Sequence, residues 1–317
     1  MTHTAPAVVA TYTRSGFAES VHVGHAVVVD AAGTVVRSWG DPNHLIFPRS
    51  AAKPAQATAM VRHGLDLPDH LLALAVASHG GERIHLAGVH EILDQAGLDV
   101  SALQTPEDFP LDPQERDVWL CEGRRPTPLA NTCSGKHAAM LLTCVINGWS
   151  VSDYLRPEHP LQQAIRWQVE ALAGEKVAHV GIDGCGAPVM AISVTGLARS
   201  LSRCMTEDAH APARRVGAAM VAFPEFVGGA YSDITRLMRA VPGLAAKDGF
   251  EGVGVAALPD GSAVAVKVND GSERARQVAV AAILAGLGVD RLALEPFLSL
   301  PVVGAGEVVG RISSPIA

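Results

Sequence analysis

Lysine is scarce in this sequence: 5 of its 317 residues are lysine, against 20 arginines. Positive charge at the surface therefore falls mainly to arginine, whose guanidinium stays protonated in proteins. A partly buried lysine can instead lose its proton and act as a base or as a metal ligand. Three of the lysines, Lys53, Lys136 and Lys267, lie in segments that carry other reactive side chains. This distribution favours an enzyme.

The sequence also lacks the features of exported, membrane and nucleic-acid-binding proteins. No segment approaches the roughly 18 uninterrupted apolar residues of a membrane-spanning helix. Residues 1–6 lack the basic region and apolar stretch of a signal peptide. The net charge of −7 argues against nucleic acid or an acidic membrane as a partner. An odd number of cysteines, 5, fits free thiols in a reducing compartment, so we expect a cytoplasmic protein.

Cofactor motifs are absent as well. There is no Gly-x-Gly-x-x-Gly or phosphate-binding loop, which argues against a nucleotide cofactor. The histidines are scattered and form no His-Glu-x-x-His metal helix. Any metal site must therefore draw on other side chains.

The apolar pattern predicts a mixture of helices and strands. At 48% hydrophobic and 18% charged residues, the chain can bury a large core. We expect strands at residues 21–29, 34–39, 177–182, 252–258 and 262–268, and helices at 51–62, 85–97, 137–147 and 274–287. The run 71–77 suits a buried strand or a buried helix, and 104–127 is expected to be a long irregular excursion. The pattern indicates an α/β or α+β fold, as one catalytic domain over residues 1–317 or as two interleaved lobes.

A Ser-x-x-Lys pair stands at the start of the first predicted helix. Residues three apart share a helix face, so the amine of Lys53 can reach the hydroxyl of Ser50. A neutral lysine amine can accept the serine proton and so produce a nucleophile without histidine. The same pattern serves penicillin-binding proteins and serine β-lactamases.

Two further segments carry candidate chemistry. Ser78 and His79 end a buried apolar run, where a core opens to a cleft, although Ser78 could equally be a helix cap. Lys267 lies in the middle of a predicted strand, on the same face as Ala263 and Ala265. These small neighbours would leave room for a substrate beside Lys267. The alternative is that Lys267 simply lies on an exposed face of the strand.

A metal site is the other possibility that the sequence raises. Cys133 and Lys136 lie three apart at a helix start, and Cys185 stands between two glycines about 50 residues later. Two thiolates, one nitrogen and an open position suit Zn²⁺, with His137 the conventional nitrogen and Lys136 the unusual one. Both cysteines could instead be small buried apolar residues, as most free cysteines are.

Together these segments resemble the family of L-asparaginases typified by the inducible, thermolabile rhizobial enzyme. The resemblance rests on the stretches 47–54, 77–79, 131–140, 159–162, 181–186 and 266–271, and the strings Cys-Ser-Gly-Lys-His and Asp-Gly-Cys-Gly are the most specific of them. It implies a fold similar to serine β-lactamases and glutaminases, with a mixed sheet flanked by helices beside a helical lobe. It also implies a homodimer.

The resemblance implies hydrolysis of the side-chain amide of L-asparagine to L-aspartate and ammonia. The implied catalytic residues are two pairs, Ser50 with Lys53 and Ser78 with Lys267, and either serine could attack. The implied zinc ligands are Cys133, Lys136 and Cys185, and the side chains expected to bind substrate are Arg49, His137 and Asp183.

Two departures from the family's pattern border the expected site. The region 103–107 lacks a Cys-Gly element, and Gly80 replaces a polar residue. A related amide such as glutamine could therefore be the substrate in place of asparagine. The sequence is also compatible with a β-lactamase or esterase that uses the same serine–lysine chemistry, and with a non-catalytic zinc-binding protein.

Overall fold

The computed structural model describes residues 4–316 and contains two sheets and a set of helices. The predicted absence of a signal peptide rests in part on residues 1–3, which lie outside the described residues. The strands are β1 (Ala7–Arg14), β2 (Phe17–Val29), β3 (Val35–Trp39), β4 (Leu45–Ile46), β5 (His179–Ile182), β6 (Pro188–Ser193), β7 (Ala245–Gly249), β8 (Val253–Ala257), β9 (Ala263–Val268), β10 (Ser299–Gly304) and β11 (Glu307–Ser313).

The α-helices are α1 (Lys53–Arg62), α2 (Asp69–Ala75), α3 (Arg83–Gln95), α4 (Pro113–Cys121), α5 (Ser134–Ile146), α6 (Pro160–Ala173), α7 (Val194–Thr206), α8 (Pro212–Ala222), α9 (Pro224–Gly228), α10 (Asp233–Ala240), α11 (Glu273–Gly286) and α12 (Arg291–Leu298). Three short 3₁₀ helices are η1 (Arg49–Ala52), η2 (Val100–Ala102) and η3 (Pro128–Ala130). In the described part of the chain, no helix combines the length and apolar character needed to cross a membrane.

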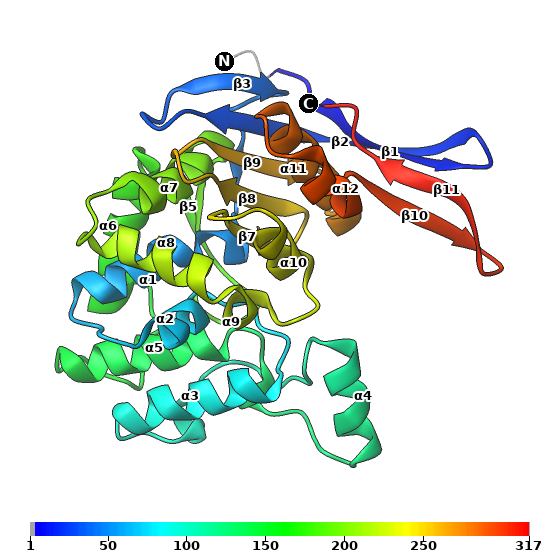
Figure 1. Ribbon diagram of the computed structural model, residues 1–317. Coiled ribbons are helices and arrows are strands. Elements are labelled where there is room, and N and C mark those ends of the chain that lie inside the picture. Colours follow the sequence, from blue (N-terminus) through cyan, green and yellow to red (C-terminus); the bar gives the residue numbers. More distant parts are fainter. Residues whose placement is uncertain (1–3, 317) are drawn as a thin grey trace.

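The larger sheet has the strand order β10-β11-β1-β2-β9-β8-β7, with β3 also paired to β2. Strands β4, β6 and β5 form the smaller sheet. Figure 1 shows β1, β2, β10 and β11 extending as an arm away from the helices. All strand pairs within residues 4–316 are antiparallel, where a mixed sheet was expected. The expected class, helices packed on a sheet beside a helical lobe, is confirmed (Figure 1).

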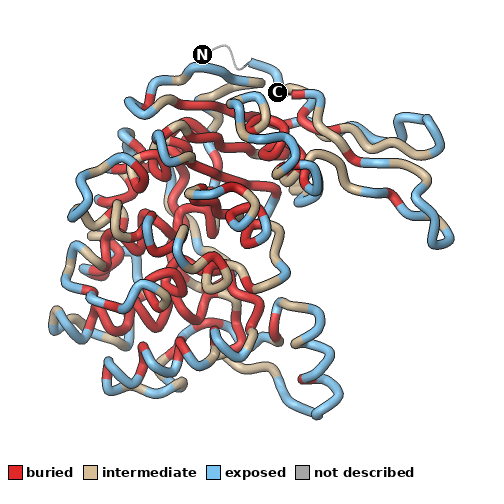
Figure 2. Tube along the Cα trace, viewed as in Figure 1, coloured by how far each residue is buried: buried red, intermediate tan, exposed pale blue. Residues whose placement is uncertain are grey.

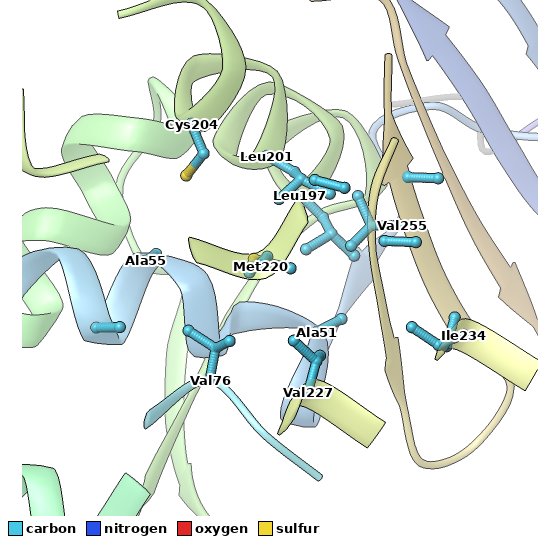
Figure 3. Close-up of a cluster of buried hydrophobic side chains, with 14 of the residues drawn as sticks. Ala51, Ala55, Val76, Leu197, Leu201, Cys204, Met220, Val227, Ile234 and Val255 are labelled. Carbon is cyan, nitrogen blue, oxygen red and sulfur yellow. The ribbon is translucent and has the colours of Figure 1, made fainter. Parts of the chain in front are cut away.

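Helices cover both faces of the central strands, because successive residues of a strand point to opposite faces. On β8, a side chain at Gly254 would touch Arg276 of α11, whereas the neighbouring Val255 lies beside Leu197 and Leu201 of α7 (Figure 3). The residues paired with them on β9, Val266 and Ala265, are both fully buried. The buried core runs from this sheet through the helical lobe, while most of the arm is exposed or half-buried (Figure 2).

The strongest sequence patterns predicted their elements correctly. The hairpin at 252–268 is β8 and β9, and the helices at 51–62, 85–97, 137–147 and 274–287 match η1 with α1, α3, α5 and α11 to within a few residues. The ambiguous run 71–77 lies mostly in α2. The excursion at 104–127 was wrongly expected to be wholly irregular, because it contains α4, which Asp112 caps by accepting hydrogen bonds from the backbone N–H groups of Gln114 and Glu115.

Candidate active site

Ser50 lies in a tight turn that leads into α1. The preceding residue, Arg49, has a φ of 53°, a left-handed conformation that residues other than glycine seldom adopt. Ser50 is 5% exposed, and its side chain has no hydrogen-bond partner within residues 4–316. It lines a cavity of about 330 Å³. The turn thus presents a free hydroxyl to this cavity.

Lys53 is the first residue of α1, and its side chain is almost completely buried. Its amine donates hydrogen bonds to the carbonyl oxygen of Ala77, to Ser78 Oγ at 3.2 Å and to Cys133 Sγ at 3.2 Å. No described hydrogen bond joins it to Ser50. Burial lowers the pKa of Lys53, which favours the neutral amine that a general base requires. Lys53 therefore connects Ser78 to Cys133.

Ser78 follows α2 and lines the same cavity as Ser50. Its backbone N–H donates to the carbonyl of Val227 at 2.9 Å, which fixes the chain where the apolar run ends. Its Oγ accepts hydrogen bonds from Lys53 Nζ at 3.2 Å and from Lys247 Nζ at 3.0 Å. The expectation that this run ends at a cleft is confirmed.

The predicted pairing of Ser78 with Lys267 is wrong, because Lys247 occupies that position. Lys247 lies on β7, which contacts η1, whereas Lys267 lies on β9, two strands further along the sheet. Two strand spacings are roughly 10 Å, beyond the reach needed for a hydrogen bond. The amine of Lys267 instead donates to the carbonyl of Glu251.

The sequence around Lys247 carries a signal of its own. Lys247, Asp248 and Gly249 form a Lys-x-Gly string like the Lys-Thr-Gly that accompanies Ser-x-x-Lys in penicillin-binding proteins and class A β-lactamases. Gly249 is required by close packing, because a Cβ there would lie 2.3 Å from the carbonyl oxygen of Pro48. This contact presses the end of β7 against the turn that carries Ser50.

Two ion pairs lie near Ser78. In one, Lys247 Nζ lies 2.5 Å from Asp248 Oδ1. In the other, Arg276 Nη1 donates a hydrogen bond to Asp233 Oδ2 at 2.7 Å. Burial alone would raise the pKa of Asp248, but the charges of Lys247 and Arg276 outweigh it and hold that pKa at about 2. Asp248 is therefore ionised at neutral pH beside the buried amine of Lys247.

The predicted zinc ligands come together on the other side of Lys53. Cys133 and Cys185 pack against each other with Ala187, and Lys136 Nζ lies 3.3 Å from Cys185 Sγ. Gly135 allows α5 to approach α2, because a Cβ there would lie 2.6 Å from the carbonyl oxygen of Leu74. Segments that are distant in sequence thereby form one buried cluster.

The two thiols of this cluster differ in acidity. A hydrogen bond between the sulfurs, with burial next, raises the pKa of Cys133 to about 12. The same hydrogen bond, aided by the charge of Lys136, lowers the pKa of Cys185 to about 4 despite burial. Burial lowers the pKa of Lys136, but the Cys185 and Cys133 sulfurs and Asp183 outweigh it, so that the pKa rises. Cys185 and Lys136 thus form a thiolate–ammonium pair.

The donor set of this cluster fits zinc. The sulfurs of Cys133 and Cys185 and the amine nitrogen of Lys136 lie side by side. His137 follows Lys136 in the sequence, and its buried Nε2 has no hydrogen-bond partner among residues 4–316. Lys136 would have to lose its proton to become a ligand. Within the described residues, no group of three or more histidine, cysteine, aspartate or glutamate side chains is placed to hold a metal ion. The two cysteines therefore make a set of three ligands only when the amine of Lys136 is counted.

The side chains predicted to bind substrate do not line the cavity. None of Arg49, His137 and Asp183 is among the residues that line it. Arg49 Nε donates to Asp183 Oδ1 at 2.6 Å, and His137 Nδ1 lies 2.8 Å from the Tyr154 hydroxyl. The structure brings Arg49 and Asp183 together as an ion pair, and their role toward a substrate stays a prediction.

Comparisons with known proteins agree with the sequence resemblance at the level of the family. The family model described as L-asparaginase II matches residues 10–314. No curated protein matches the sequence.

Several solved structures are similar to this one at low sequence identity. Mglu in its native form is 16% identical, with a TM-score of 0.44 over 79% of this chain and 60% of that chain. A β-lactamase from Mycobacterium bovis is 16% identical, with a TM-score of 0.41 over 84% of this chain and 94% of that one. A Bacillus glutaminase is 13% identical, with a TM-score of 0.41 over 79% and 84%. The match to Mglu thus spans less than two thirds of that protein's length.

The ion pair beside Lys247 predicts a pH-dependent stability difference. Because the pKa of Asp248 is about 2 when folded and 3.8 ordinarily, its contribution is present above pH 3.8 and is lost as the pH falls toward 2. We expect Asp248→Asn to lower the free energy of unfolding at pH 7 by about 1–2 kcal/mol, with allowance for its partial exposure. Urea unfolding at pH 7, 4 and 2.5 measures this difference.

The control is Asp66→Asn, which removes an exposed partner of Arg215 and should cost less than about 1 kcal/mol. A difference between wild type and Asp248→Asn that stays constant down to pH 2.5 would contradict the assignment.

Proposed function

This chain belongs to the L-asparaginase II family, a family of hydrolases that act on amides, and we propose that it converts L-asparagine to L-aspartate and ammonia. One observation carries the proposal. Two serine hydroxyls line one cavity, and one of them lies between two buried lysine amines at 3.2 Å and 3.0 Å. This is machinery for moving a proton to and from a serine without histidine.

In the proposed reaction, the Oγ of Ser50 attacks the carbon of the side-chain amide. The serine proton passes to neutral Lys53, and the C–N bond breaks as the nitrogen receives a proton and leaves as ammonia. Water then attacks the resulting ester, giving up one proton to the same amine. Release of aspartate returns the serine hydroxyl and the neutral lysine.

Ser50 suits the nucleophile better than Ser78 does. Its hydroxyl is unpartnered at the cavity, whereas Ser78 Oγ is held between Lys53 and Lys247. A hydroxyl that contacts two amines is placed to relay a proton between Lys53 and the leaving nitrogen. Ser50 is also the second residue of η1, so its own backbone N–H is a candidate donor to an oxyanion.

Zinc, as we propose, would be held by Cys133, Lys136 and Cys185. When bound, a metal ion of this kind acts as a Lewis acid or orients a substrate. The Arg49–Asp183 pair borders this cluster, because the charge of Lys136 also lowers the pKa of Asp183 against burial. Arg49 keeps donors beyond Nε that could meet a substrate carboxylate.

The test of the function is ammonia release from L-asparagine and L-glutamine side by side, with purified protein and added zinc. We expect release from asparagine and little from glutamine. Release from neither, in a folded protein, would contradict the proposal.

The nucleophile assignment predicts that Ser50→Ala lowers the turnover of L-asparagine by about 1000-fold or more. The zinc content, measured by elemental analysis, should stay unchanged because Ser50 contacts none of the proposed ligands. Near-normal turnover in this variant would move the nucleophile to Ser78.

The corrected lysine assignment predicts that Lys247→Met lowers kcat by about 100-fold, since a general acid–base contribution of that size is typical. Lys267→Met removes the same charge two strands away and should cost much less. Melting temperatures of both variants control for folding. A larger loss at Lys267 than at Lys247 would restore the original pairing.

The zinc assignment predicts that Cys185→Ser lowers the molar ratio of zinc to protein, because a thiolate ligand is replaced by a weakly acidic hydroxyl. Cys204→Ser is the matched control, since Cys204 on α7 is also buried but packs in the main core and not against Cys133 and Cys185. Equal zinc content in the two variants would remove Cys185 from the ligand set.

A further inference from the structure

Residues 109–126, which include α4, form an excursion whose two ends meet. The backbone N–H of Asp108 donates to the carbonyl of Thr127 at 3.1 Å, and the N–H of Thr127 donates back to the carbonyl of Asp108 at 2.9 Å. Figure 1 shows α4 standing apart from the other helices, and Figure 2 shows that most of it is exposed. The base of the excursion is therefore one pair of residues.

Few interactions attach this excursion to the rest of the protein. Within the described part of the chain, no apolar side chain of residues 109–126 belongs to the main hydrophobic core or packs against it. Between these residues and the segments beyond their base, the one hydrogen bond within residues 4–316 runs from the backbone N–H of Asp112 to the carbonyl of Gly80, at 2.9 Å. A segment with so few tertiary contacts opens at a low cost in free energy.

The excursion is nevertheless ordered by its own side chains. Asp112 caps α4, and the guanidinium of Arg124 lies over the ring of Trp119, 5.2 Å from its centroid. Arg116 lies over Phe109 in the same way, at 5.5 Å. A loop packed by its own side chains can keep its shape while it moves as a unit.

The start of α4 forms part of the cavity that contains the serines. Leu111, Asp112 and Pro113 line it together with Ser50 and Ser78. Displacement of the excursion would remove this side of the cavity. Both serines would stay in place, because each adjoins a residue of the main core.

Two glycines let the excursion lie close to the end of the apolar run. A Cβ at Gly80 would lie 3.0 Å from Asp112 Cβ, and a Cβ at Gly81 would lie 2.8 Å from Pro110 Cβ. Gly81 also has a φ of 84°, which favours glycine. Side chains at these two positions would hold the excursion away from the serine cavity.

We propose that residues 109–126 are a lid on the serine cavity, which turns about the Asp108–Thr127 pair and rests, when closed, against residues 80–81. Lifting the lid admits substrate and releases products, and lowering it holds a small amide against the serines. The inference rests on the proposed function only in placing the reaction at the two serines. It adds a conformational step to each turnover.

Hydrogen exchange followed by mass spectrometry measures the opening in the wild-type protein. We expect the backbone amides of residues 117–121 in α4 to exchange at least about 100-fold faster than those of residues 89–93 in α3. Helix α3 is the matched control, because it is also partly exposed but packs Val89, Ile92 and Leu93 into the main core. Equal exchange rates in the two helices would overturn the lid.

An engineered disulfide tests whether turnover needs the movement. The Cβ positions of residues 80 and 112 lie 3.0 Å apart, and a shift of about 0.5–1 Å brings them to the spacing of a disulfide. The double variant is Gly80→Cys with Asp112→Cys, in a Cys121→Ser background that removes the exposed thiol of α4. We expect its oxidised form to release ammonia from L-asparagine at least about tenfold more slowly than its form reduced with tris(2-carboxyethyl)phosphine.

The two single variants in the same background, treated identically, are the controls for oxidation of the other cysteines. Neither can form the bridge, so reduction should not restore activity in them as it does in the double variant. Peptide mapping confirms the disulfide. Its failure to form would show that the lid does not lie against Gly80 and would overturn the closed position.

The two measurements separate this inference from the proposed function. If the wild type releases no ammonia from L-asparagine but α4 exchanges faster than α3, the proposed function fails and the lid stands. If L-asparagine is hydrolysed and the bridged double variant works as fast as its reduced form, the lid is overturned while the function stands.

Discussion

The structure depends on keeping three lysine amines in its interior. Lys53, Lys136 and Lys247 are each no more than 1% exposed. Moving an ammonium ion from water into a protein interior costs several kcal/mol unless the ion is paired with a negative group. A buried lysine without such a partner loses its proton instead. Each lysine here meets this constraint differently: Lys136 has the Cys185 sulfur, Lys247 has Asp248, and Lys53 has only neutral acceptors and a lowered pKa. The arrangement of the surrounding segments follows from these needs.

A fold can satisfy them only by bringing distant segments into close contact. Glycine makes two of these contacts possible, since side chains at Gly135 and Gly249 would overlap the carbonyl oxygens of Leu74 and Pro48. These contacts place α5 against α2 and β7 against η1. A side chain at either position would force apart the segments that carry the lysines and the serines.

Local patterns predicted much of this, and long-range pairing explains what they missed. The Ser-x-x-Lys spacing, the end of the apolar run at Ser78 and the Cys-Lys-Cys cluster all depend on short stretches, and the structure brings those residues together. The partner of Ser78 depends on which strand is last in the sheet, and alternation along β9 carries no information about that order. Strand β7 was overlooked because its small residues are buried on both faces and show no alternation. The cavity lining joins residues from loops and helix starts far apart in sequence, which no local pattern could group.

Lys53 makes the serines and the cysteine cluster a single electrostatic unit. One amine contacts both Ser78 Oγ and Cys133 Sγ, each at 3.2 Å, so the two sites share one base. Charge brought to Cys133 acts on this amine at contact distance and with little screening, because Lys53 and Cys133 are both buried. The cluster can therefore influence the serines without touching a substrate. The cavity already contains the hydroxyl groups of Ser50 and Ser78, so the cysteines are not needed as nucleophiles. Acting on the charge of Lys53 is a role that suits them without direct contact with a substrate.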